Sequence, residues 1–232
     1  GPMQEDQRDS QIEVVENFIG QNVDGLVLAP LDDRALVTPV TQAITAGIPV
    51  VVIDSGLKSD DIVSFCATDN FAGGVLAGDR LADLIDGEGK VMMLRYQVGS
   101  ASTERREAGF LTALEKFPDI EVISSNQYAG PTRDTANTAA ENLLNRYGDD
   151  VHGVFASNQS ASNGMLLALR ANGKAGGQIK FVGFDGGETN IEALRAGDIQ
   201  GLVLQDPFNM GYKGVMAMAE HLQGESVPER ID

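Results

Sequence analysis

The stretch FVGFDG, residues Phe181–Gly186, has the form of a short buried strand that ends at an acid followed by glycine. Three other apolar runs also end in polar side chains: VVVID (Val50–Asp54), GVFASN (Gly153–Asn158) and GLVLQD (Gly201–Asp206). The carboxyl ends of parallel strands meet at one edge of a sheet, and α/β proteins gather their ligand groups there. We therefore predict parallel strands whose ends bring polar side chains to one cleft.

Strand-like and helix-like segments alternate along the rest of the chain. Strands are predicted at 25–30, 49–53, 64–67, 90–94, 120–126, 153–156, 179–183 and 201–204, and helices at about 10–20, 38–46, 71–85, 102–117, 135–147, 160–171, 191–196 and 210–222. Ser10 and Glu13 have the spacing of a capping box for the first helix. Alternation with short connections is the signature of a parallel α/β architecture.

The helix predicted at 71–85 is rich in small side chains. These are Ala72, Gly73, Gly74, Ala77 and Gly78. The glycines weaken a helix on its own, but small side chains let a neighbouring backbone approach closely. We therefore expect this helix to pack tightly against another element.

The composition excludes several classes of function. With 34 acidic and 17 basic residues among 232, the formal net charge is −17. So acidic a chain repels phosphate backbones, which excludes nucleic acid as a partner. The apolar runs have the length of strands, so no membrane-spanning segment is expected. Cys66 is the only cysteine, which rules out an intrachain disulfide and a cysteine-based metal site.

Seven segments, taken in order, carry a resemblance to a known family. They are VVENFIGQNVDGLVLAP, AGIPVVVIDS, TDNFAGGVLAGDRLA, ERREAGF, VFASNQSASNGMLLALR, VGFDG and AGDIQGLVLQDPFNMG. Their order and spacing resemble the type I periplasmic sugar-binding proteins, above all the ribose-binding subfamily. The resemblance covers nearly the whole chain.

The family implies a specific architecture of two α/β lobes. Each lobe has a parallel, Rossmann-like sheet, and three crossovers form a hinge between the lobes. The resemblance places residues 1–68 and about 185–204 in the first lobe, and residues 69–157 and about 205–232 in the second, with the division inside 158–204 left open. The crossings are expected at Ala67–Asn70, near Asn158 and near Gln205. By comparison with the family, we expect this chain to lack the first strand, first helix and second strand of the first lobe, and to stop before the usual last strands.

Six residues match ligand-binding positions of the family. They are Asp54, Arg106, Asn158, Phe184, Asp185 and Gln205. Carboxylates accept sugar hydroxyls, Arg, Asn and Gln supply donors, and an aromatic face such as Phe184 covers the apolar side of a sugar ring. Each residue also has an alternative: the acids and Asn158 as caps, Arg106 as a solvated helix charge, Gln205 with no role in the site, and Phe184 as core.

Two positions depart from the ribose-binding pattern. Ser55 stands where ribose binders carry an arginine after the cleft acid, and Pro131 is the residue nearest to their second-lobe stacking phenylalanine. These differences argue against ribose itself as the ligand.

Motifs for catalysis or for a cofactor are absent from the sequence. It contains no GxxxxGK[ST] phosphate loop and no HExxH, and Gly87-Glu88-Gly89 precedes a strand where a dinucleotide loop would follow one. Asp54 and Asp185 as a glycosidase pair would need an identifiable acid partner, and the sequence offers none. We therefore expect no enzyme activity, no cofactor and no metal.

The resemblance implies a solute-binding protein that presents a sugar or a similar small polar molecule to the permease of an ABC transporter. It implies a monomer that is periplasmic or lipid-anchored outside the cell, without insertion into the membrane, although no signal sequence is recognisable in this chain. One alternative is the effector-binding domain of a sugar-responsive LacI-type transcription regulator, which shares the fold. The other is a carbohydrate-active enzyme.

Overall fold

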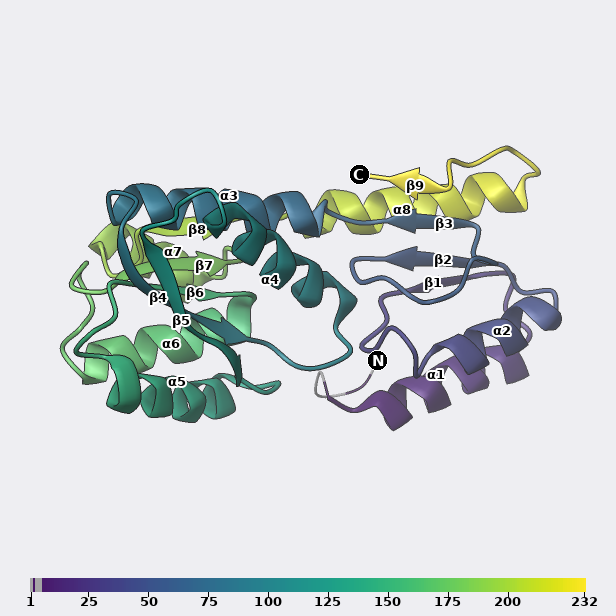
Figure 1. Ribbon diagram of the computed structural model, residues 1–232. Coiled ribbons are helices and arrows are strands. Elements are labelled where there is room, and N and C mark those ends of the chain that lie inside the picture. The colour runs from purple at the N-terminus through teal and green to yellow at the C-terminus, as the bar shows by residue number, and fades with distance from the viewer. Residues whose placement is uncertain (1, 3–5) are drawn as a thin grey trace. The chain divides into compact units, whose positions relative to one another are not determined.

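The computed structural model describes residue 2 and residues 6–232, and it confirms the alternating α/β pattern (Figure 1). The helices are α1 (Arg8–Gly20), α2 (Val37–Thr45), α3 (Asn70–Leu84), α4 (Ala101–Leu114), α5 (Arg133–Tyr147), α6 (Gln159–Ala171), α7 (Glu188–Ala196) and α8 (Pro207–Leu222). The strands are β1 (Leu26–Leu28), β2 (Val50–Ile53), β3 (Ser64–Cys66), β4 (Gly89–Arg95), β5 (Ile120–Tyr128), β6 (Gly153–Ala156), β7 (Lys180–Phe184), β8 (Gly201–Val203) and β9 (Arg230–Ile231). None of the helices described is long and apolar enough to cross a membrane.

The first of two α/β units consists of the described part of residues 1–69 together with 98–102 and 206–232. Its sheet has the order β1-β2-β3-β9, and every neighbouring pair is parallel. Val50 and Val52 of β2 face a core shared with α1 and α2, whereas Val51 points the other way, toward Ala217 and Met218 of α8. Strand β2 is therefore covered on both faces, which explains its uninterrupted apolar sequence.

The second unit comprises residues 70–97 and 103–205. Its five parallel strands have the order β5-β4-β6-β7-β8. Val91 and Met93 of β4 belong to the core on the side of α3 and α4, and Met92 and Leu94 belong to the core on the side of α5 and α6. Figure 1 shows these two helix pairs on opposite sides of the sheet. Alternate side chains of one strand thus fill two cores.

The predicted division of the chain between two lobes needs correction. Strands β7 and β8 extend the second sheet, where Val154 of β6 lies beside Phe181 of β7, so residues 185–205 belong to the second unit. Helix α8 packs on β2, so 206–232 belongs to the first unit. The chain changes unit after Asp69 and after Gln205, as expected, but not near Asn158, because β6 pairs only with strands of the second unit. Residues 98–102 also belong to the first unit.

Two local features also differ from the expectation. Helix α1 already begins at Arg8, after Gln7, so Ser10 lies inside the helix and the predicted capping box does not form. The short strand β9 was not expected, and it pairs with β3 beside the carboxyl-terminal helix. In Figure 1 this yellow end of the chain runs along the blue strands of the first sheet.

Candidate functional site

Asp185 stands at the carboxyl end of β7 with a left-handed backbone, φ 71°. Its N–H donates to the carbonyl of Val203 on β8 at 2.8 Å. The carboxylate accepts from Gln205 Nε2 at 2.7 Å and from the backbone N–H of Gln159, the first residue of α6, at 3.1 Å. A carboxylate at a helix amino end is favoured by the helix dipole. Since its side chain remains 21% exposed and has lone pairs to spare, Asp185 can accept further hydrogen bonds from a ligand.

Arg106 lies beside this carboxylate and is almost completely buried, with 2% of its surface exposed. Its Nε donates to Asn70 Oδ1 at 2.7 Å, and Nη1 donates to the carbonyl of Ser157 at 3.1 Å. The same Nη1 lies 3.8 Å from Asp185 Oδ2. A buried guanidinium is stabilised only where acceptors surround it. The interpretation of Arg106 as a solvated helix charge is therefore wrong.

Phe184 does not have the role predicted for it. Its side chain is fully buried in the core between the sheet and α3. The guanidinium of Arg106 covers the ring at 3.9 Å from its centroid, a cation–π contact. No face of this ring is free to cover a sugar, so the prediction of Phe184 as a ring-stacking residue is corrected. Phe184 instead packs its ring against the Arg106 guanidinium.

The close packing expected of α3 is present and determines where Arg106 stands. A Cβ at Gly74 would overlap the carbonyl oxygen of Arg106, and one at Gly73 would come within 3.0 Å of the Phe184 ring. Helix α4 therefore lies directly on α3, and only glycine allows this approach. The small residues of α3 are thus part of the geometry of the site.

Asn158 and Gln205 complete the polar groups around Asp185. Asn158 caps α6, since its Oδ1 accepts from the N–H of Ala161 at 3.1 Å and its Nδ2 donates to Ser160 Oγ at 3.0 Å. The capping alternative for Asn158 is therefore correct, and one amide hydrogen remains available. Gln205 Oε1 is buried and has no hydrogen-bond partner among the described residues. The two amides thus leave two donor hydrogens, one on each nitrogen, and one acceptor oxygen for a ligand.

Asp54 belongs to the first unit and repeats the backbone geometry of Asp185. It follows β2 with φ 64°, and its N–H donates to the carbonyl of Cys66 on the neighbouring β3 at 3.0 Å. The next residue, Ser55, accepts from the N–H of Ser102 at 3.2 Å. Left-handed non-glycine residues at strand ends are uncommon and concentrate at functional sites. Each unit thus has one such acid at the carboxyl edge of its sheet.

The structure brings four of the six predicted ligand residues together in the second unit, with Phe184 beneath them and Asp54 in the first unit. Sequence reasoning missed the supporting residues Asn70, Ser157 and Glu107. Glu107 is 2% exposed, and its carboxylate accepts from Arg95 Nε at 2.6 Å, Tyr96 N–H at 3.1 Å and Ser157 Oγ at 3.0 Å. Burial raises the pKa of Glu107 against the opposing effect of Arg95. No local pattern marks these residues, because their contacts are made between distant segments.

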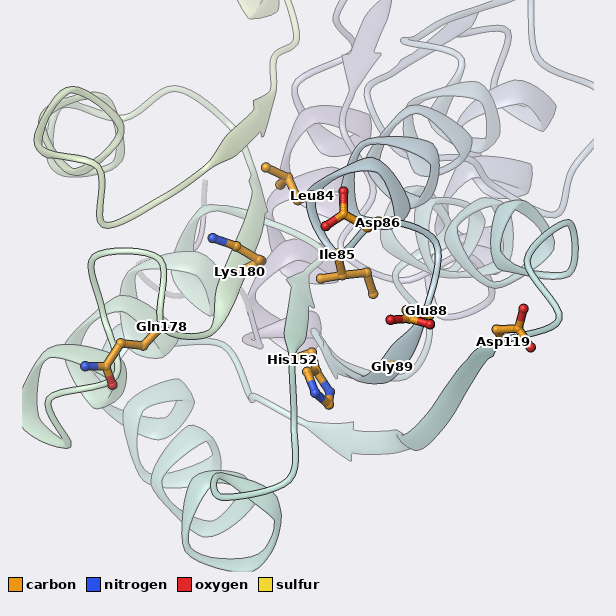
Figure 2. Close-up of a pocket in the computed structure, with 9 residues that line it drawn as sticks. All are labelled: Leu84, Ile85, Asp86, Glu88, Gly89, Asp119, His152, Gln178 and Lys180. Carbon is orange, nitrogen blue, oxygen red and sulfur yellow. The ribbon is translucent and has the colours of Figure 1, made fainter.

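A separate hollow of about 600 Å³ opens at the other edge of the second sheet, where the strands begin (Figure 2). Gly89, His152 and Lys180 line it from the starts of β4, β6 and β7, together with acidic side chains. His152 Nδ1 is engaged, since it accepts from the N–H of Lys90 at 3.0 Å. Figure 2 shows the polar side chains spread around the rim, not converging on one point. Nowhere in the part of the chain that the structure describes do three metal-binding side chains cluster.

Known proteins match this chain along almost its whole length. The family model for the periplasmic binding protein domain matches residues 1–226. The xylitol-binding protein of Mycolicibacterium smegmatis is 30% identical over 85% of this chain, which spans 56% of that protein. The ribose import binding protein of Bacillus subtilis is 32% identical over 94% of this chain, which spans 69% of it.

Solved structures agree with the sequence relatives. The periplasmic component of an ABC-type sugar transport system from Hahella chejuensis has a TM-score of 0.93 at 36% identity, covering 97% of this chain and 82% of that one. A carbohydrate transporter solute-binding protein from Agrobacterium radiobacter, in complex with D-arabinose, has a TM-score of 0.95 at 33% identity. The match covers 100% of this chain and 79% of that one. The chain therefore belongs to the periplasmic binding protein domain family, with the parallel α/β units of its type I fold.

Proposed function

We propose that this chain binds a sugar or a similar polyhydroxyl molecule and presents it to an ABC transporter. The observation that carries the proposal is the carboxylate of Asp185, held at the end of β7 by Gln205 and the amino end of α6, with Arg106 3.8 Å away. Sugar hydroxyls are both donors and acceptors, so a carboxylate beside a guanidinium and amides can bind adjacent hydroxyls. Relatives that bind xylitol, ribose and D-arabinose support the same class of ligand.

The same relatives support a proposal for the partners and the location of this chain. We infer that the chain works outside the cytoplasmic membrane, in the periplasm or tethered by a lipid, as a monomer that docks on an ABC permease. It acts by binding and release and makes or breaks no covalent bond. The relatives described above are binding or transport proteins, which supports this role over that of a regulator's effector domain.

Titration calorimetry tests the proposal directly. The panel is D-ribose, D-arabinose, D-allose, D-fucose and xylitol, chosen because relatives or similar structures are named for them. We expect at least one to bind, and Asp185→Ala to weaken that binding by about tenfold or more, the size of a lost charged hydrogen bond. Asp149→Ala is the control, since this exposed acid of the second unit pairs, among the described residues, with Lys174 of the same unit alone. Equal affinities of the two variants would contradict the assignment of Asp185.

A further inference from the structure

The buried carboxylate of Glu107 joins three segments that surround the candidate site. It accepts from Arg95 and Tyr96 at the end of β4 and from Ser157 Oγ just after β6. Glu107 itself follows Arg106 on α4, and the carbonyl of Ser157 accepts from Arg106. One carboxylate is thus connected to Arg106 both along the helix and through Ser157.

We propose that Glu107 is a positioning residue: its carboxylate fixes Ser157 so that the Ser157 carbonyl holds the Arg106 guanidinium in its binding orientation. The consequence for ligand affinity rests on the proposed function, whereas the effect on Arg106 does not. Glu107 touches no ligand in this account, because only 2% of it is exposed and its oxygens are occupied by Arg95, Tyr96 and Ser157.

A purely structural role explains Glu107 less well. The charged group that faces it among the described residues is Arg95 on β4, while Tyr128 of β5 and Glu104 of α4 lie near Arg95. Despite the ion pair with Arg95, burial raises the pKa of Glu107, so its ionised form is disfavoured by the fold. A buried ion pair often stabilises less than apolar residues of the same volume would. The charge is better explained by the orientation that it imposes on Ser157 and Arg106.

The Nε–H of Arg106 reports on this orientation without any ligand. It is buried and donates to Asn70 Oδ1, so its NMR signal should be resolved and slow to exchange with water. Arg106→Lys identifies the signal by removing it. In the wild type we expect the signal to shift on acidification, as Glu107 takes up a proton and releases Ser157. Because burial raises the pKa of Glu107, the midpoint of this shift should lie above pH 4.5.

Two variants and one control separate positioning from general destabilisation. In Glu107→Gln the Arg106 signal should be displaced at neutral pH, exchange faster and lack the titration. Glu115→Gln removes an exposed carboxylate just beyond the end of α4 and should behave like the wild type. Ser157→Ala removes only the hydroxyl that contacts Glu107, and it should displace the signal in the same direction. A Glu107→Gln protein that is folded and has an unmoved, still titrating Arg106 signal overturns the proposal.

Affinity for the panel sugar that binds most tightly, measured by calorimetry, provides the second readout. Glu107→Gln should weaken binding by about tenfold, the scale known for loss of a residue that orients a metal ligand. Because Glu107 acts through Ser157, a protein with both Glu107→Gln and Ser157→Ala should lose no more affinity than the more damaging single variant. If the two losses of binding free energy add up, the proposed route through Ser157 is contradicted. If no panel sugar binds the wild type, the proposed function fails while the Arg106 signal still decides the role of Glu107. If sugars bind and Glu107→Gln changes neither affinity nor signal, only the positioning role fails.

Discussion

At the scale of single residues, the two acids at strand ends stand out by their backbone. Asp54 and Asp185 have φ of 64° and 71°, and each N–H pairs with the carbonyl of the adjacent strand. Asp and Asn tolerate this conformation better than other side chains, whereas alanine does not. The chain therefore holds each carboxylate at a turn where most residues would cost stability.

Two substitutions at Asp185 separate the effect of its backbone conformation from the effect of its carboxylate charge. Asp185→Ala should lower the free energy of unfolding by about 1–2 kcal/mol, since alanine is strained at positive φ. Asp185→Asn keeps the tolerance for this backbone and should cost less stability. Both should lose about tenfold or more in sugar affinity, because neither supplies a charged acceptor. Urea unfolding and calorimetry check the pair, and an Asn variant that keeps wild-type affinity would show that the charge is dispensable.

The raised pKa of Glu107 predicts a specific dependence of stability on pH. The folded protein holds the Glu107 proton to a higher pH than the unfolded chain does, so it binds more protons in the range above 4.5. The contribution of Glu107 to stability is therefore greatest below 4.5 and is lost as pH rises through the folded pKa. Relative to Glu107→Gln, the wild type should become less stable along this range in urea unfolding. A difference that grows in favour of the wild type with rising pH would contradict the direction of the shift.

At the scale of elements, the contact between α3 and α4 determines the position of Arg106. Gly74 allows the α4 backbone to lie against α3, and Gly73 makes room for the Phe184 ring that lies beneath the guanidinium. The spacing of small residues in a helix thus has a consequence at the binding site.

Gly74→Ala tests this contact. The added methyl group has no room, so we expect the free energy of unfolding to fall by about 1–3 kcal/mol, the usual cost of overpacking. Sugar affinity should fall as well, because α4 and Arg106 must move. Gly211→Ala in α8 is the matched control: nothing lies near its Cβ position, and alanine there should stabilise by up to about 1 kcal/mol. Equal effects of the two changes in urea unfolding would mean that the α3–α4 contact is not tight.

At the scale of the whole molecule, the carboxyl-terminal helix completes the first unit. Ala217 of α8 is 2% exposed and packs against the Val51 face of β2. Asp in its place would bury an unpaired charge against this face. Because proteins open locally in cooperative units, the loss of stability should be confined to the unit to which α8 belongs.

Hydrogen exchange measured by mass spectrometry can locate that damage. Ala217→Asp should speed exchange in peptides covering β2 and β3 and leave β6 and β7 protected. Val215→Asp, on the exposed side of the same helix, should change neither region. Faster exchange confined to β6 and β7 would instead show that α8 packs on the second unit, to which the family resemblance had assigned it.

The sequence predicts the order and type of nearly all elements, because periodicity, glycines and prolines are local signals. It does not predict that residues 185–205 belong to the second unit or that α8 belongs to the first. Those depend on strand pairing between segments far apart, such as Val154 beside Phe181. The strand β9 is only two residues long and has no periodicity to detect.

The candidate site is predicted in part for the same reason. Asp185 and Arg106 are found because strand ends and a family motif mark them. Glu107 and Asn70 are missed, since their partners lie on other elements and only the folded chain brings them together. The role of Phe184 is mistaken because sequence reveals an aromatic ring but not that a guanidinium covers it.

A crystal structure of the protein with the panel sugar that binds most tightly will show whether Asp185 and Arg106 contact the ligand. We expect sugar hydroxyls within about 2.6–3.1 Å of the Asp185 carboxylate and the Arg106 guanidinium, at the carboxyl ends of the strands of the second sheet. A sugar bound instead in the hollow beside His152, with Asp185 and Arg106 untouched, would contradict it.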